Sequence, residues 1–469
     1  MTHCRFRLGS YMKKQKVGLV VDNPHRDLEG LVLVAAHLTK KNFDVVLIPM
    51  YKQRFVVKSQ SVDIIVLNYL RPNNLETFLD FLRDGIKVAV LDTEGIAGRN
   101  FEEFADFVCK TKMTQLIDLY MFWGSGQLDA VQKRKNYLPK KTIITGNPRY
   151  DFFAEPWLRS INNQVSQSNF VLFNTNFPIV NPKFSADKEE EYKTMLAVGF
   201  TPEIARNAVK QNMAAFLGMK KLLRMLAKAL PDQNFILRPH PFEDINGYIE
   251  FEEFQNIKVV QSGSANSWIL GSSALVHLNC TTAIEASLMG KLVVTPSWLN
   301  DSVIYRPLPD GLSKSVDTIE EMIEILRLKP AKRDTTQERS DNINRELMFQ
   351  SFHHIDGKSA VRVTEAIRGL ASFIGSTSTI PKKSTFKKLK KIALNISEIP
   401  VLWQLREKLK NTNKSKSFTG NDVNIILKRL NKVEPKFANL VANDICRMQT
   451  IKSRFSDIVA VNLSDTEDV

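Results

Sequence analysis

The sequence predicts an α/β protein in which two parallel sheets, each covered by helices on both faces, face each other across a cleft. Short runs of Val, Ile and Leu alternate with amphipathic stretches through residues 14–160, and the same alternation repeats through residues 165–345. Strands that are apolar on both faces and separated by helices are typical of buried parallel sheets. A chain of 469 residues is also too long for one hydrophobic core.

The first half is predicted to be a Rossmann-like domain over residues 14–160. It lacks a GxGxxG turn, which argues against a dinucleotide-dependent oxidoreductase. We expect helices at 28–41 and 75–85. The strands are expected at 16–24, 43–50, 62–69, 86–95, 116–124 and 141–148.

The second half is predicted to be another Rossmann-like domain, over residues 165–345, followed by a helix within 346–375 that closes it and a tail over 376–469. Ligands of open α/β sheets bind beyond the carboxyl ends of the strands, so polar residues at those ends are candidate site residues. Helices are expected at 204–229 and 281–289, and strands at 169–177, 233–241, 257–263, 273–279 and 291–296.

Cysteine and histidine usage argues against a structural metal or a disulfide framework. The four cysteines form no CxxC pair, and the adjacent His353 and His354 would point about 100° apart on a helix. We therefore expect no metal. The N-terminus has no apolar signal region, and no stretch reaches the length of a membrane span, so a cytoplasmic protein is expected.

The net charge of +15 is concentrated in the segment 381–416, which holds eleven Lys or Arg against two Glu. Phe386, Leu389 and Ile392 recur there at helical spacing, and Trp403 follows. A basic amphipathic segment favours adsorption to an anionic membrane surface, here the inner face of the cytoplasmic membrane. Nucleic acid needs the same charges, but no zinc finger, helix-turn-helix or aromatic RNA motif accompanies them, so nucleic acid is not expected as a partner. A solvated tail is the alternative.

A polar turn after the strand at 273–279 is the most informative motif. The strand stops at Asn279, and Thr281 and Thr282 then open a helix. The free N–H groups of a helix N-terminus attract anions, and two hydroxyls could bind the same phosphate. Glu285, one turn later, could reach ribose hydroxyls. The alternative is a simple threonine N-cap, with Glu285 completing a capping box.

The sequence Arg238-Pro-His240-Pro241 ends another strand of the same half. The arginine offers a bidentate phosphate contact, and the histidine could donate to a phosphate or protonate a leaving oxygen. A rigid turn with a solvent-facing histidine is the alternative. Three polar residues at or after the ends of other strands of this half complete the expected donor site: Asn174, Asn176 and Ser264.

Two further motifs end strands of the first half. In LDTEG (91–95), Asp92 and Glu94 are candidates for a general base, a role that contributes about 10²- to 10⁴-fold, and Gly95 would let the backbone pass close to a ligand. A solvated loop is the alternative. In TGNPRYD (145–151), Asn147 and Arg149 are placed at the cleft or at an interdomain hinge.

Together these four motifs resemble those of bacterial GT-B transferases, over roughly residues 14–370. The combination looks most like the surface carbohydrate biosynthesis proteins, and is similar to sialyltransferases, Kdo transferases and CDP-glycerol glycerophosphotransferases. The resemblance implies that His240 and the threonine pair bind the donor phosphate, and that Asp92 or Glu94 is the base. The sequence departs from the sialyltransferase pattern in having threonines for serines and in separating its two acidic residues.

The function expected from this resemblance is glycosyl transfer from a nucleotide-activated sugar, most simply a CMP-linked one, to a lipid-linked glycan of capsule or lipopolysaccharide. The first domain would hold the acceptor and the second the donor. No cofactor beyond the nucleotide-sugar is expected. Two alternatives stay open: a polyol-phosphate transferase that uses CDP-glycerol or CDP-ribitol, and a non-catalytic membrane-associated assembly protein.

Overall fold

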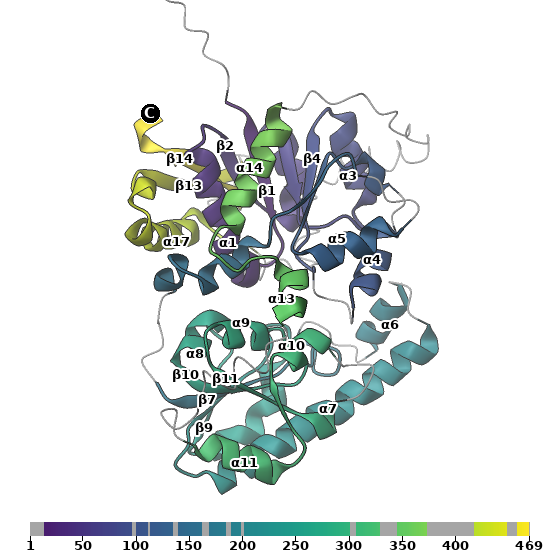
Figure 1. Ribbon diagram of the computed structural model, residues 1–469, viewed down its shortest axis with the longest axis vertical. Helices are drawn as coiled ribbons and strands as arrows, with labels where there is room; N and C mark the ends of the chain where they lie inside the picture. Colours follow the sequence, from purple (N-terminus) through teal and green to yellow (C-terminus); the bar gives the residue numbers. More distant parts are fainter. Residues whose placement is uncertain are drawn as a thin grey trace, which may run out of the picture.

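The computed structural model has the GT-B architecture, with two Rossmann-like domains one above the other (Figure 1). Each domain is built on its own mostly parallel sheet, so the predicted fold class is confirmed. The structure describes residues 14–95, 100–110, 113–134, 139–161, 168–183, 189–197, 201–300, 306–328, 345–372, 417–447 and 457–468.

The N-terminal sheet has the strand order β13-β14-β2-β1-β3-β4-β5-β6, in which β13 is Leu440–Arg447 and β14 is Asp457–Asp465. All neighbouring strands from β2 to β6 are parallel. The direction in which successive strands are added to the sheet reverses between β1 and β3, which lie side by side. The parallel strands are β1 (Lys16–Val21), β2 (Asp44–Pro49), β3 (Ile64–Leu67), β4 (Lys87–Leu91), β5 (Leu119–Phe122) and β6 (Thr142–Ile144).

Helix α1 (Pro24–Thr39) begins earlier than predicted. The Asn23 side chain accepts a hydrogen bond from the backbone N–H of His25, and Pro24 occupies the first turn, where its missing N–H costs nothing. The first strand therefore ends at Val21 instead of 24. The other helices of this part are α2 (Gln53–Ser59), α3 (Leu75–Arg83), α4 (Phe101–Cys109) and α5 (Ser125–Gln132), with the short helices η1 (Met50–Lys52), η2 (Thr114–Leu116), η3 (Pro148–Phe153) and η4 (Trp157–Ser160).

The C-terminal sheet has the order β12-β11-β10-β7-β8-β9, all parallel, and its chain order reverses between β10 and β7. The strands are β7 (Phe170–Asn174), β8 (Phe235–Arg238), β9 (Ile257–Val259), β10 (Ser272–Val276), β11 (Leu292–Pro296) and β12 (Lys314–Val316). The helices are α6 (Glu190–Ala197), α7 (Pro202–Ala229), α8 (Ala265–Gly271), α9 (Thr282–Leu288), α10 (Pro307–Gly311) and α11 (Ile319–Arg327), with η5 (Ile245–Glu253) and η6 (Ser297–Leu299).

The chain returns to the first domain after α11, so the predicted helix within 346–375 does not close the second domain. Helices α13 (Arg345–Phe352) and α14 (Ser359–Ser372) pack on the N-terminal domain, where α14 lies against α1 (Figure 1). The buried Asp151 carboxylate accepts hydrogen bonds from the backbone N–H groups of Ser359 and Ala360, at 2.8 and 2.7 Å. These bonds satisfy the first turn of α14.

The interpretation of 376–469 as one tail is wrong for residues 417–447 and 457–468. Helix α17 (Gly420–Val433) packs on α1, and the hairpin of β13 (Leu440–Arg447) and β14 (Asp457–Asp465) completes the N-terminal sheet, with η9 (Pro435–Phe437) before it and η10 (Thr466–Asp468) after it. Strand β14 pairs antiparallel with β2. This pairing covers the edge of β2, which would otherwise expose a row of unpaired backbone groups. The predicted membrane segment 381–416 lies outside the described residues.

Within the described ranges, no helix combines the length and the apolarity that crossing a bilayer requires. The same residues contain no group of three or more His, Cys, Asp or Glu side chains placed to hold a metal ion.

Candidate active site between the two domains

A cleft of about 380 Å³ lies between the two domains, at the carboxyl ends of both sheets. This is where ligands of open α/β sheets bind. Of the residues that the sequence singled out, eleven line it: Glu94 and Arg149 from the first domain, and Asn174, Asn176, Arg238, His240, Pro241, Ser264, Thr281, Thr282 and Glu285 from the second.

Glu94 is a carboxylate that the first domain presents to the cleft. Its side chain is 40% exposed, and its Oε1 accepts a hydrogen bond from Arg26 Nη1 at 2.7 Å. Arg26 in turn contacts Asp27 at 2.8 Å and Asp22 at 3.0 Å. Enclosure between the domains raises the pKa of the Glu94 carboxyl, and Arg26 opposes that shift. Arg26 therefore holds the Glu94 side chain in place, and the pKa of Glu94 is shifted toward the range in which a general base works best.

Asp92 does not line the cleft, although the sequence made it an equal candidate. It is 1% exposed, and its Oδ2 accepts from Arg71 Nη2 at 2.7 Å and from the Tyr120 hydroxyl at 2.9 Å. Its Oδ1 accepts from the backbone N–H of Glu94 at 2.9 Å. These contacts hold the turn that carries Glu94, and Asp92 itself does not reach the cleft.

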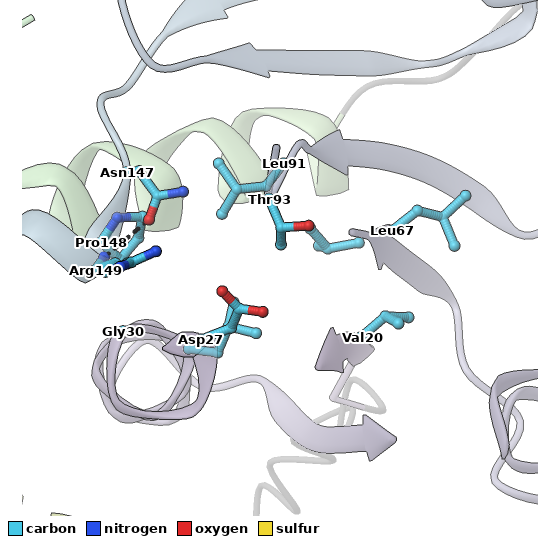
Figure 2. Close-up of a pocket in the computed structure, with 11 residues that line it drawn as sticks. Val20, Asp27, Gly30, Leu67, Leu91, Thr93, Asn147, Pro148 and Arg149 are labelled. Atoms are coloured by element: carbon cyan, nitrogen blue, oxygen red, sulfur yellow. Dashed lines mark hydrogen bonds between the residues drawn. The ribbon is translucent and has the colours of Figure 1, made fainter. Parts of the chain in front are cut away.

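A smaller cavity of about 20 Å³, room for one water molecule, lies at the crevice where β1, β3 and β4 end. Figure 2 shows Asp27 projecting from α1 into this space, with Asn147 and Arg149 beside it and Leu91 and Thr93 across from it. Gly30 of α1 lets η3 approach, because a Cβ there would lie 2.7 Å from the Arg149 nitrogen. Close packing of α1 on η3 thus places Arg149 at the cleft.

Arg238 is a buried cation without an acidic partner. The residue is 7% exposed, its Nη2 donates to the Gly263 carbonyl at 2.7 Å, and its Nε has no hydrogen-bond partner. No carboxylate of the described residues pairs with it, and burial lowers its pKa. Burying an uncompensated charge is costly, so this position is suited to a ligand that brings a negative charge.

His240 is oriented as a neutral hydrogen-bond donor. Its Nδ1 accepts from the backbone N–H of Phe242 at 3.2 Å, which leaves the proton of the neutral ring on Nε2. Burial lowers the pKa of His240 to about 4, and the positive charges of Arg238 and Arg26 act in the same direction. At neutral pH the side chain can therefore donate from Nε2, but it carries no positive charge.

The loop that carries His240 is fixed by the buried carboxylate of Glu243. Its Oε1 accepts from the His240 backbone N–H and from the Thr175 hydroxyl, both at 2.9 Å. The Tyr248 hydroxyl donates to the other carboxylate oxygen. Gln261 adds a 2.8 Å bond to the His240 carbonyl. These bonds fix the backbone of the loop, and the half-buried side chain of His240 lines the cleft.

The threonine pair does not form the capping box that was the alternative to ligand binding. Thr281 is the N-cap of α9, but its side chain makes no capping hydrogen bond, and the third helical residue is Ile284. Thr282 Oγ1 instead accepts from Asn174 Nδ2 at 2.8 Å. The Asn174 Oδ1 is buried and has no partner, which leaves an acceptor at the cleft.

An ion pair between Arg149 and Glu285 crosses from one domain to the other. Glu285 is almost completely buried, and the carboxylate oxygen that does not contact Arg149 has no hydrogen-bond partner. Among the residues that the structure describes, three buried atoms at the cleft have no hydrogen-bond partner: a donor on Arg238 and acceptors on Asn174 and Glu285. Buried polar atoms are normally paired, so three such atoms around one cavity indicate a polar ligand.

Three more predicted site residues lie away from the main cleft. Gly95 packs against the ring of Trp123, and a Cβ at this position would lie 2.7 Å from that ring. The glycine is therefore needed for packing, and it does not line the cleft. Asn147 accepts from the Arg149 N–H at 2.9 Å as the N-cap of η3. Asn279 has a positive φ of 53°, and its side chain donates a hydrogen bond to Asn300. It lines a neighbouring cavity of about 210 Å³ and not the main cleft.

The first turns of α1 and its N-cap residue contribute cleft residues that the sequence analysis missed. Asn23, His25, Arg26 and Glu29 all line the cavity. The signal was present, because the polar run that starts at residue 22 directly follows a buried strand, as the other motifs do. Trp123 and Phe152 add apolar walls on the same side.

The comparisons with known proteins agree on the fold. No protein-family model matches this chain, and no curated protein sequence matches it. A UDP-N-acetylglucosamine 2-epimerase of known structure superposes with a TM-score of 0.50 at 13% identity, covering 79% of this chain and 100% of that one. At this identity the likeness establishes the fold and nothing beyond it.

Two other solved structures are similar at lower scores. The UDP-GlcNAc 2-epimerase of Methanocaldococcus jannaschii, in complex with UDP-GlcNAc and UDP, has a TM-score of 0.47 at 13% identity over 76% of this chain and 100% of that one. The wall teichoic acid polymerase TagF has a TM-score of 0.48 at 10% identity, over 76% and 89%.

Proposed function

We propose that the protein is a GT-B glycosyltransferase that transfers a sugar from a nucleotide donor, most simply a CMP-linked one, to a lipid-linked acceptor in capsule or lipopolysaccharide synthesis. The single observation that carries this proposal is the pairing of unlike groups across the cleft. A buried, unpaired Arg238 lies on one side, and the carboxylate of Glu94 lies on the other. One attracts a phosphate, and the other can accept a proton.

The reaction follows from these two groups. The acceptor hydroxyl oxygen attacks the anomeric carbon as Glu94 takes its proton, and the bond from that carbon to the nucleotide phosphate breaks. Arg238 and the Nε2–H of His240 stabilise the charge that develops on the leaving phosphate. Asn174 and Glu285 offer acceptors for donor hydroxyls. Because these residues supply the charge stabilisation, we expect turnover without an added metal ion.

Peripheral attachment to the inner face of the cytoplasmic membrane, through the segment 381–416, belongs to the same proposal. A lipid-linked acceptor stays in the bilayer, and each Lys or Arg near an anionic surface contributes about 1 kcal/mol. In the sequence the segment lies between α14 and α17, and α17 packs on α1, which carries His25 and Arg26 at the cleft.

Calorimetric titration of the full chain with CMP, CDP, UDP and GDP, in the presence of EDTA, tests the donor class. We expect the cytidine nucleotides to bind and the others to bind at least tenfold more weakly. Preference for CDP, with release of CMP from CDP-glycerol, would show a polyol-phosphate transferase instead. A UDP preference would contradict the CMP-linked donor, and no binding by any nucleotide would overturn the transferase proposal and leave the assembly protein.

Two replacements of His240 should show whether its side chain binds the nucleotide by donating a hydrogen bond or by carrying a positive charge. His240→Gln keeps an N–H near the position of Nε2, whereas His240→Ala removes it. Because the native ring is neutral, we expect the glutamine variant to retain most of the nucleotide affinity and the alanine variant to lose about tenfold, as for one hydrogen bond to a charged group. Equal losses in both variants, measured in the same calorimeter, would contradict a role as a neutral donor.

A further inference from the structure

One face of the long helix α7 (Pro202–Ala229) is both basic and apolar. The helix carries six Lys or Arg and a single acidic residue, Glu203. Its buried face packs on the C-terminal sheet, and the opposite face follows the outer rim of the lower domain in Figure 1. At the helical period, Lys210, Leu217, Lys221 and Lys228 fall on one line along that face.

The apolar side chains on this face are large and exposed. Leu217 is 56% exposed, and Met213 and Met225 are exposed beside it. Trp298 of η6 is also exposed, and η6 packs on α7 at Gly218, where a Cβ would lie 2.6 Å from the Leu299 side chain. An ordinary solvated helix face carries charges without such a row of long apolar groups.

The cations on the same line are available for a partner. Lys220 and Arg224, at the side of the helix, are neutralised by Glu250, the former at 2.7 Å. In contrast, Lys210, Lys221 and Lys228 form no ion pair with any carboxylate of the described residues. The surface therefore combines unpaired positive charge with exposed Met and Leu, which we call the α7 face (Lys210, Met213, Leu217, Lys221, Met225 and Lys228).

We propose that the α7 face binds the surface of an anionic lipid bilayer. Long apolar side chains can enter the headgroup layer while lysines on the same helix contact lipid phosphates, and this combination distinguishes bilayers from other polyanions. The choice of a bilayer rests on the proposed function, in which the acceptor is lipid-linked. The surface itself is separate from the segment 381–416 and belongs to the donor domain.

Co-sedimentation of the full chain with mixed phosphatidylcholine–phosphatidylglycerol vesicles tests the proposal, with pure phosphatidylcholine vesicles as the neutral comparison. We expect Lys221→Gln/Lys228→Gln to weaken partitioning into the mixed vesicles about 30-fold, and Leu217→Ser to weaken it about tenfold. Helix α17 offers matched controls. Lys428→Gln/Lys432→Gln removes two exposed lysines, and Ile425→Ser removes an aliphatic group that is 47% exposed.

The proposal stands if only the α7 variants lose binding. Equal losses in the α7 and α17 variants would show a general charge effect and overturn it, as would unchanged binding in the α7 variants. If Leu217→Ser instead dissolves a dimer of the chain and leaves vesicle binding intact, the face binds a second copy, and the bilayer proposal fails. Nucleotide titration of the same preparations tests the proposed function separately.

Discussion

Glu94→Gln should leave a folded protein that binds nucleotide and turns over about 10²- to 10⁴-fold more slowly. The amide keeps an oxygen that can accept from Arg26, so the contact at 2.7 Å and the shape of the turn persist. What is lost is the ability to take a proton from the acceptor hydroxyl. Steady-state turnover and calorimetric nucleotide affinity, measured on one preparation, distinguish loss of the base from loss of the site.

The matched control for this variant is Glu102→Gln on α4. Glu102 is also a glutamate of the first domain paired with an arginine, Arg134, but it lies outside the cleft. We expect this control to be fully active. If Glu94→Gln retained more than a tenth of wild-type turnover, Glu94 would not be the base, and His25 and Glu29, which line the same side of the cleft, would become the candidates.

The pH dependence of turnover should also reflect the ionisation of Glu94. The base must be ionised to act, so turnover rises as pH rises through the pKa of Glu94. Because enclosure raises that pKa, the rising limb should lie above the range of an ordinary glutamate, which titrates near about 4.3. The limb should disappear in Glu94→Gln. A limb that persists in the variant would assign the titration to another group.

The parts of the fold that local patterns encode were predictable, and the parts that depend on distant pairing were not. Each parallel strand is a short apolar run, and this pattern is visible in the sequence without any knowledge of its neighbours. The hairpin of β13 and β14 pairs with β2 across more than 400 residues, at Leu463 and Val45. No local pattern specifies such a partner. The return of α14 to α1 was missed for the same reason, since its anchor is Asp151.

The candidate site shows the same division. The rule that ligands bind at the carboxyl ends of parallel strands selected His240, Arg238 and the threonine pair, because strand ends converge whatever the details of packing. It could not separate Asp92 from Glu94. That distinction depends on Arg71 after β3 and Tyr120 on β5, which lie far from LDTEG in the sequence and surround only the first of the two carboxylates.

The buried ion pair between Arg71 and Asp92 should contribute strongly to stability. Arg71→Met removes the buried partner of Asp92 and should lower the free energy of unfolding by about 3–5 kcal/mol, because an unpaired carboxylate is left in the core. Adding Asp92→Asn should recover much of that loss. The asparagine is neutral, and its oxygen can still accept from the Glu94 N–H. Urea unfolding of the two variants measures both values.

The double variant also separates structure from catalysis at this turn. If Asp92 only shapes the loop, Arg71→Met/Asp92→Asn should retain turnover within about tenfold of wild type once the protein is folded, whereas Glu94→Gln should not. Loss of activity in a double variant that unfolds at wild-type urea concentrations would assign Asp92 a direct part in the reaction. A carboxylate that is 1% exposed and bonded to Arg71 and Tyr120 has no free path to the acceptor, and this contact set is why we expect the first result.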